Sequence, residues 1–202
     1  MKGLTFVYAV HDNLYINLTN RCPCRCTFCI RQFGDGAYGS DSLWLEREPS
    51  CKEVFAEFDK YDLSEYSEIV FCGYGEPMER AEDVSFIGKE LKKRYPEIKI
   101  RLNTNGLSDK IHGKSTAYLL EDAVDIVSIS LNSGNSEDYM KVTRPKWEDS
   151  FDAMLKFAED CKKYVPQVMF TVVDVISEKE INDSKAVSER LGIPLRIRKY
   201  DT

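Results

Sequence analysis

The chain has 202 residues, of which 43% are hydrophobic and 31% charged, and this balance predicts a globular domain with its own core. Its 34 acidic residues outnumber its 28 basic ones, so the net charge of −6 argues against broad electrostatic binding of nucleic acid. No apolar run reaches the roughly 18 residues of a membrane span, and the amino-terminal residues lack the apolar stretch of a secretion signal. We therefore expect a cytoplasmic protein with no membrane partner.

Short apolar segments alternate along the chain with amphipathic segments. The predicted strands are Leu14–Leu18, Glu68–Cys72, Ile98–Asn103, Asp125–Leu131, Val168–Val175 and Leu195–Lys199. The predicted helices follow the capping box at Ser50 and Glu53, cover about Glu82 to Tyr95, Ser115–Glu121 and Trp147–Tyr164, and run from a second capping box at Ser177 to near Gly192. A glycine-rich segment, Gly34–Ser42, is either a lid or a surface connection.

From the second predicted strand onward, the strand starts fall roughly thirty residues apart, which is the length of a strand–helix unit. Such repetition indicates a parallel sheet with right-handed crossovers. Because a complete eightfold barrel usually needs about 250 residues, we expect the α/β class and an open, partial (β/α)6 TIM-like barrel. One domain spans residues 1–202 in this interpretation, and the functional residues lie at the carboxyl ends of the strands.

Four of the seven cysteines fall between positions 22 and 29, which indicates metal or redox chemistry rather than a disulfide framework. Cys22, Cys26 and Cys29 follow the pattern C-x3-C-x2-C directly after the first predicted strand. Three thiolates on one loop can hold three irons of a [4Fe-4S] cluster and leave the fourth iron open to a substrate or cofactor. Cys24 does not fit this spacing, so we expect it to have no role, unless it replaces a lost ligand.

This loop resembles the signature C-x3-C-x-Φ-C of the radical S-adenosylmethionine (radical SAM) superfamily, in which Φ is aromatic and is Phe28 here. Gly73-Tyr74-Gly75-Glu76-Pro77, after the second predicted strand, resembles the GGEP motif of that family with Tyr74 inserted. The resemblance implies that this segment positions the amino group of SAM, whereas Phe28 shields the cluster and flanks the adenine. The inserted Tyr74 leaves open which glycine carbonyl makes the contact.

The later strand ends also match the family, where small polar groups bind the ribose, the methionine carboxylate and the adenine. The positions that this resemblance assigns to SAM are Asn103, Asn105, Ser128, Ser130, Asn132 and Val173. Each is weak alone, since Asn-Gly is foremost a turn signal. The assignment is supported by their order along the chain, because they follow the cysteines and the GxGEP segment as in the family.

Several segments, among them LYINLTNRCPCRCTFCIR, IVFCGYGEPMER and the RIRKY ending, resemble the TatD-linked (TatD-associated) radical SAM proteins. The resemblance implies an enzyme in which a [4Fe-4S] cluster reductively cleaves SAM, and the resulting 5′-deoxyadenosyl radical abstracts hydrogen from a substrate. It also implies an external electron donor, flavodoxin or ferredoxin-like, and a functional link to a TatD-family nuclease. It assigns no catalytic residue beyond the cluster ligands. The substrate is unknown, with a slight preference for a nucleotide-related one.

Two other functions remain open on the sequence. One is an activating enzyme that makes a glycyl radical on a partner protein, because a small open barrel leaves one side uncovered. The other is an interaction module in which Cys22, Cys24, Cys26 and Cys29 bind zinc. Structural zinc sites usually draw their ligands from separated segments, and zinc would leave the GYGEP segment without a function.

Overall fold

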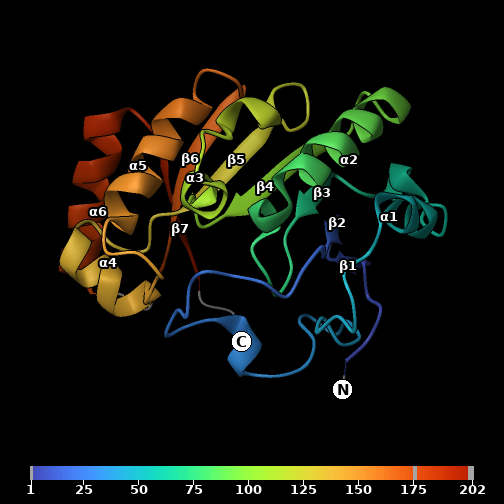
Figure 1. The fold of residues 1–202 in the computed structure, drawn as a ribbon, viewed down its shortest axis with the longest axis horizontal. Coiled ribbons are helices and arrows are strands. Elements are labelled where there is room, and N and C mark those ends of the chain that lie inside the picture. The colour runs from blue at the N-terminus through green and yellow to red at the C-terminus, as the bar shows by residue number, and fades with distance from the viewer. Residues whose placement is uncertain (1, 175–176, 200–202) are drawn as a thin grey trace.

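The computed structural model describes residues 2–174 and 177–199, which build one curved seven-stranded sheet with helices along one side (Figure 1). The strands follow chain order across the sheet, and only β1 is antiparallel to its neighbour. Their bounds are β1 Val7–Val10, β2 Asn13–Ile16, β3 Glu68–Phe71, β4 Lys99–Thr104, β5 Ile126–Ser130, β6 Gln167–Val173 and β7 Leu195–Arg198. The predicted α/β class and open parallel arrangement are therefore confirmed.

The helices follow their strands as crossovers and cover the outer face of the sheet (Figure 1). The α-helices are α1 Cys51–Phe58, α2 Ala81–Arg94, α3 Ser108–His112, α4 Ser136–Thr143, α5 Ser150–Cys161 and α6 Glu178–Leu191. The 3-10 helices are η1 Ile30–Gln32, η2 Leu63–Glu65, η3 Pro77–Arg80 and η4 Ala117–Leu120. None of these helices is long and apolar enough to cross a membrane.

Both predicted capping boxes are present, and each explains where its helix begins. The Ser50 side chain accepts a hydrogen bond from the Glu53 amide, and the Glu53 carboxylate accepts one from the Ser50 amide. Ser177 and Glu180 repeat the arrangement at α6, which ends at Gly192 in the left-handed conformation. These reciprocal bonds satisfy amide groups that a helix amino terminus otherwise leaves without partners.

The six predicted strands correspond to β2 through β7, although Val175 lies outside the described residues. The predicted helix Ser115–Glu121 is wrong in type, because the structure has only the 3-10 helix η4 there. The antiparallel β1 and the short helices α3 and α4 were not predicted. Strand β1 forms a tight hairpin with β2 through His11, whose φ is 49°. The apolar run before this turn is the signal that would have identified β1.

Side chains alternate between the two faces of the parallel strands. The outward row from Ile69, Leu102, Val127 and Phe170 is buried with the helices in the main hydrophobic core. The opposite face is more polar and includes Asn103 and the β5 serines. All carboxyl ends of β2 to β7 meet at one edge, where the cysteine loop begins after β2.

Candidate active site

The cysteine loop is held in place by backbone contacts with a segment much later in the chain. The Arg25 amide donates to the Thr143 carbonyl at 3.0 Å, and the Thr27 amide donates to the Val142 carbonyl at 2.9 Å. Cys24 forms an antiparallel bridge with Pro145. The end of α4 thus supplies a short strand-like edge that fixes the conformation of residues 24–27.

The cysteines of this loop have different surroundings. Cys24 is only 3% exposed and packs in the main core, whereas Cys22, Cys26 and Cys29 are partly exposed. Hydrogen bonding with the Cys24 side chain lowers the pKa of Cys22 to about 6 and also lowers the pKa of Cys26. The same bonds raise the pKa of Cys24, and burial raises the pKa of Cys29. Because iron binds the thiolate, two predicted ligands are already in a favourable environment.

Asn105, predicted to bind SAM, lies beside the first cysteine. Its Nδ2 atom donates to the Cys22 sulfur at 3.8 Å, and its Oδ1 atom accepts from the Leu107 amide at 2.9 Å. Both ends of the amide are therefore oriented by the structure. A hydrogen bond to a ligand sulfur tunes the potential of an iron–sulfur cluster.

The donor set fits a cluster better than a single metal ion. Within the described ranges, no three His, Cys, Asp or Glu side chains converge closely enough to hold one metal ion. The zinc hypothesis requires the Cys24 sulfur as a fourth ligand, but the raised pKa of this buried thiol disfavours the thiolate form that zinc binds. The three remaining thiols stand on one loop at the spacing of the signature, and a cluster offers each of them a separate iron.

The glycines of the GYGEP segment permit a close approach between β3 and the chain that follows β2. A Cβ atom on Gly73 would lie 2.2 Å from Asn17 Oδ1, and one on Gly75 would lie 2.2 Å from the Thr19 carbonyl oxygen. Any side chain at these positions would displace the chain that leads into the cysteine loop. The two glycines therefore keep the GYGEP backbone next to the cysteines.

Glu76 is a buried brace between the ends of β3 and β4. It is 4% exposed, and its two oxygens accept from the Thr104 hydroxyl at 2.7 Å, the Asn105 amide at 2.7 Å and the Met78 amide at 3.1 Å. Burial, and next the charge of Cys22, raise the pKa of the carboxyl to about 8. The carboxylate thus orders Asn105 and the turn after β4, and most of its acceptor sites are used within the chain.

The inserted Tyr74 extends toward the glycine-rich loop. It is 3% exposed, and its hydroxyl lies 2.9 Å from the Gly34 carbonyl oxygen and 3.0 Å from that of Gly36. Its ring meets Trp44 edge-on at 5.1 Å, and its own carbonyl accepts from Arg31 at 3.3 Å. The Tyr74 side chain therefore anchors one end of the Gly34–Ser42 loop, while its backbone stays beside the cysteine loop.

The remaining predicted SAM residues form rows across the inner face of the sheet. Strand register places Asn103 opposite Ser128, and Ser130 opposite Thr171, which in turn lies opposite Arg196. Val173 lies opposite Arg198, and Asn132 follows β5 with its amide donating to the Thr171 carbonyl. The Oδ1 atom of Asn103 is buried with no hydrogen-bond partner in the described structure, so it is available to a ligand. Phe28 is half-buried on the cysteine loop.

The sequence of residues 16–185 matches the family model of the radical SAM superfamily. The chain belongs to the radical SAM superfamily. Members of this family use a [4Fe-4S] cluster and SAM, and the chain is an enzyme domain of this class. The resemblance in the cysteine loop and the GYGEP segment is thereby confirmed at the level of the superfamily.

Curated relatives of the chain include GTP 3′,8-cyclases. That of Aliarcobacter butzleri is 25% identical over 193 residues, which cover 94% of this chain and 55% of the relative. The probable GTP 3′,8-cyclase of Thermococcus kodakarensis is 28% identical over 187 residues, covering 92% and 55% of the two chains. This chain thus spans about half the length of these relatives.

Solved structures confirm the radical SAM fold. SuiB of Streptococcus suis bound to precursor peptide SuiA aligns with a TM-score of 0.66 and 17% identity, over 96% of this chain and 40% of that one. Methylornithine synthase (PylB) aligns with a TM-score of 0.61 and 12% identity, over 94% and 53%. At these identities the likeness concerns the fold alone.

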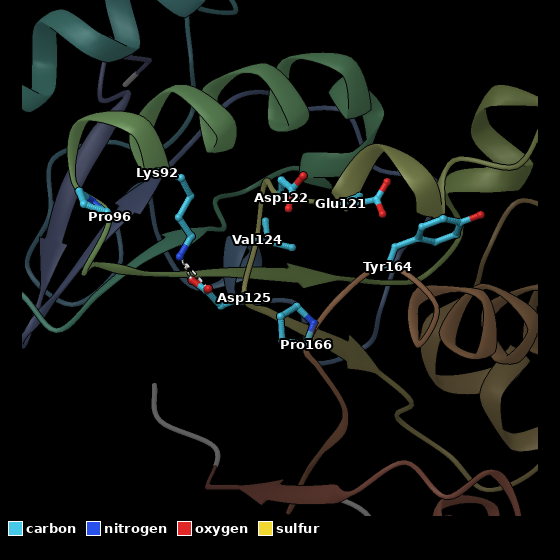
Figure 2. Close-up of a pocket in the computed structure, with 8 residues that line it drawn as sticks. All are labelled: Lys92, Pro96, Glu121, Asp122, Val124, Asp125, Tyr164 and Pro166. Carbon is cyan, nitrogen blue, oxygen red and sulfur yellow. Dashed lines mark hydrogen bonds and ion pairs between the residues drawn. The ribbon is translucent and has the colours of Figure 1, made fainter.

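A hollow of about 470 Å³ lies away from the radical SAM site, at the amino-terminal ends of β4 to β6 (Figure 2). There Lys92 pairs with Asp125, which also accepts from the Ile100 amide at 2.7 Å. The cysteine loop begins at the opposite edge of the sheet, so this hollow does not belong to the site.

The contacts of two residues that shape the radical SAM site were not predicted from the sequence. Arg31 donates to the carbonyls of Asn20, Tyr74 and Cys24 at 3.2–3.4 Å, and so joins the cysteine loop to the GYGEP segment. Pro145 bridges Cys24 from beyond α4. Neither residue belongs to a recognised motif, and the only signal in the sequence was the position of Arg31 two residues after Cys29.

Proposed function

We propose that Cys22, Cys26 and Cys29 hold a [4Fe-4S] cluster whose open iron binds SAM. The observation that supports this most directly is the set of three partly exposed thiols on a loop fixed by backbone bonds, two of them with lowered pKa. The bound cofactors would supply a 5′-deoxyadenosyl radical that abstracts hydrogen from the substrate. The protein orders these groups and limits access of water to them.

The roles of the other residues follow from their places. Backbone carbonyls of Gly73, Tyr74 and Gly75 accept hydrogen bonds from the amino group of SAM. Glu76 acts indirectly, because its carboxyl group accepts from the Asn105 amide and so holds Asn105 in place. The small polar side chains at Asn103, Ser128, Ser130 and Asn132 leave room along the inner face for ribose hydroxyls and the methionine carboxylate, with Val173 and Phe28 beside the adenine. Residues 1–202 form one such core domain in this proposal.

We infer a nucleotide-related substrate. The similarity to GTP 3′,8-cyclases over nine-tenths of the chain supports this class, and so do Arg196 and Arg198, which strand register places on the inner side of exposed β7. Guanidinium groups suit phosphates. The proposal also includes a functional link to a TatD-family nuclease, which is an enzyme that acts on nucleic acid. It further includes a cytoplasmic location, which agrees with the free cysteines of the described chain.

Anaerobic reconstitution with iron and sulfide tests the cofactor proposal. We expect a brown protein whose electron paramagnetic resonance signal changes with SAM and which forms 5′-deoxyadenosine under a chemical reductant. The triple variant Cys22→Ala/Cys26→Ala/Cys29→Ala is the control. A wild-type protein that retains zinc but binds no iron would contradict the proposal.

The substrate class is tested separately with the loaded enzyme. We expect GTP or another nucleotide to increase 5′-deoxyadenosine formation above the rate without substrate, with deuterium transferred from labelled nucleotide. An increase caused only by a partner protein that then carries a glycyl radical would instead support an activating enzyme, for which the open side of the sheet leaves space.

A further inference from the structure

Two exposed arginines lie next to each other along the backbone contact that holds the cysteine loop. Cys24 bridges Pro145, and the following residue, Arg25, donates its amide to the Thr143 carbonyl at 3.0 Å and to the Arg144 carbonyl at 3.3 Å. Side chains alternate along an extended segment. Because Cys24 points into the core, Arg25 points outward, and both arginines are exposed. Lys146 adds an exposed cation two residues later. We call these three residues the basic patch.

The patch lacks the counter-ions that other arginines near the loop have. Arg21 pairs with Glu48 at 2.8 Å, and Arg80 pairs with Asp83 at 2.6 Å. In contrast, no carboxylate of the described residues lies within ion-pair distance of Arg25 or Arg144. Nearby acids of α4 are already engaged, since Glu137 and Asp138 both pair with Lys141.

The chain as a whole carries a net charge of −6, so the patch is a local exception and not part of a generally basic surface. An acidic partner would neutralise these exposed cations and be attracted to this one place. The charge pattern therefore favours a negatively charged protein surface.

The patch includes a residue of the loop that carries the proposed cluster ligands. Arg25 stands between Cys24 and the proposed ligand Cys26, and its backbone is part of the same fixed loop. A partner that contacts Arg25 would therefore touch the loop that holds these ligands. Weak, charge-steered contacts of small area are typical of electron-transfer complexes.

We propose that the basic patch of Arg25, Arg144 and Lys146 is the docking surface for an acidic one-electron carrier protein, such as a flavodoxin, that reduces the cluster. The inference rests on the proposed function, because it requires the cluster. The carrier gives up one electron and the oxidised cluster accepts it, so the exchange is balanced.

The test is stopped-flow reduction of the reconstituted protein by flavodoxin hydroquinone at several ionic strengths. We expect Arg25→Glu/Arg144→Glu to lower the second-order rate constant about tenfold at low salt and to weaken its salt dependence. A matched control, Lys52→Glu/Lys89→Glu, makes the same change of charge at an exposed position of α1 and a partly exposed position of α2, and it should be reduced much faster than the patch variant.

Reduction by dithionite, iron content and the cluster spectrum separate docking from the proposed function. These should match the wild type in the patch variant, because a small reductant needs no docking surface. If flavodoxin reduces the patch variant at the wild-type rate, the docking proposal is wrong. It is also wrong if the control variant is slowed as much as the patch variant. The same holds if a nucleotide or nucleic acid, and not flavodoxin, loses affinity on charge reversal. Failure of every form to bind iron would instead contradict the proposed function.

Discussion

The two faces of the sheet are built by different chemistry. On the outer face, Ile69, Phe71 and Phe170 are fully buried under the helices, and their contacts are apolar. On the inner face, Asn103 and Ser128 lie side by side on adjacent strands, and polar groups predominate around them. The outer face therefore accounts for most of the stability, whereas the inner face can vary with the ligand at modest cost to the fold. Mutations on the two faces should separate these properties.

The largest effect is expected at the cysteine loop. Replacing Cys22, Cys26 or Cys29 singly with Ala should abolish SAM cleavage, because two thiolates cannot hold the cluster in place. Iron content and 5′-deoxyadenosine formation measure this outcome. Cys51→Ala is a suitable control, since Cys51 lies on α1 and hydrogen-bonds Asp83. A Cys26→Ala protein with full iron and full cleavage would show that the assigned ligands are wrong.

On the outer face, Phe170→Ala should lower the free energy of unfolding by about 3–5 kcal/mol, since it leaves a cavity beneath the helices. The inner-face change Ser130→Ala should cost less than about 1 kcal/mol and instead weaken SAM binding. Denaturant unfolding and equilibrium dialysis with SAM measure the two quantities. Equal losses of stability in the two variants would contradict the division between the faces.

Glu76→Gln tests the buried hydrogen bonds that join the end of β3 to the end of β4. Either orientation of the new amide points its NH2 group at a backbone N–H, of Met78 or of Asn105, so we expect a loss of about 1–3 kcal/mol at pH 6.

The pH dependence gives a second readout at this position. The pKa of Glu76 is raised to about 8, above an unfolded value of about 4.3. Its contribution to stability is therefore fully present below about pH 4 and is lost as the pH rises through 8. Unfolding of the apoprotein between pH 4 and 9 should follow this slope in the wild type and show less of it in Glu76→Gln. Identical slopes would indicate that another group titrates.

The smallest effect is expected for Cys24→Ala, which should keep most SAM cleavage. The substitution removes one buried sulfur from the core, at a cost of roughly 1 kcal/mol. Loss of its hydrogen bonds should also raise the pKa of the Cys22 thiol, which thiol alkylation rates against pH can measure in the apoprotein. Loss of cleavage at normal iron content would show that Cys24 acts in the site.

The strands, and the signature formed by Cys22, Cys26 and Cys29, could be recognised in the sequence because their signals are local, namely apolar runs and short spacings. The functions of Tyr74, Glu76 and Cys24 could not, because each depends on a partner far along the chain. Glu76 was predicted to help position the amino group of SAM, and the structure adds that its oxygens contact Thr104 and Asn105, while Tyr74 contacts Gly34. No spacing within a motif encodes such contacts, which arise only when the strand ends are brought to one edge.

The backbone bonds between the cysteine loop and residues 142–145 have a consequence for how the protein matures. During synthesis the cysteines leave the ribosome long before the segment that gives their loop its shape. Until α4 and Pro145 have been synthesised and have packed against the loop, the cysteine loop lacks the backbone hydrogen bonds that fix its conformation. We therefore expect the cluster to be inserted only after β5, α4 and Pro145 have been synthesised.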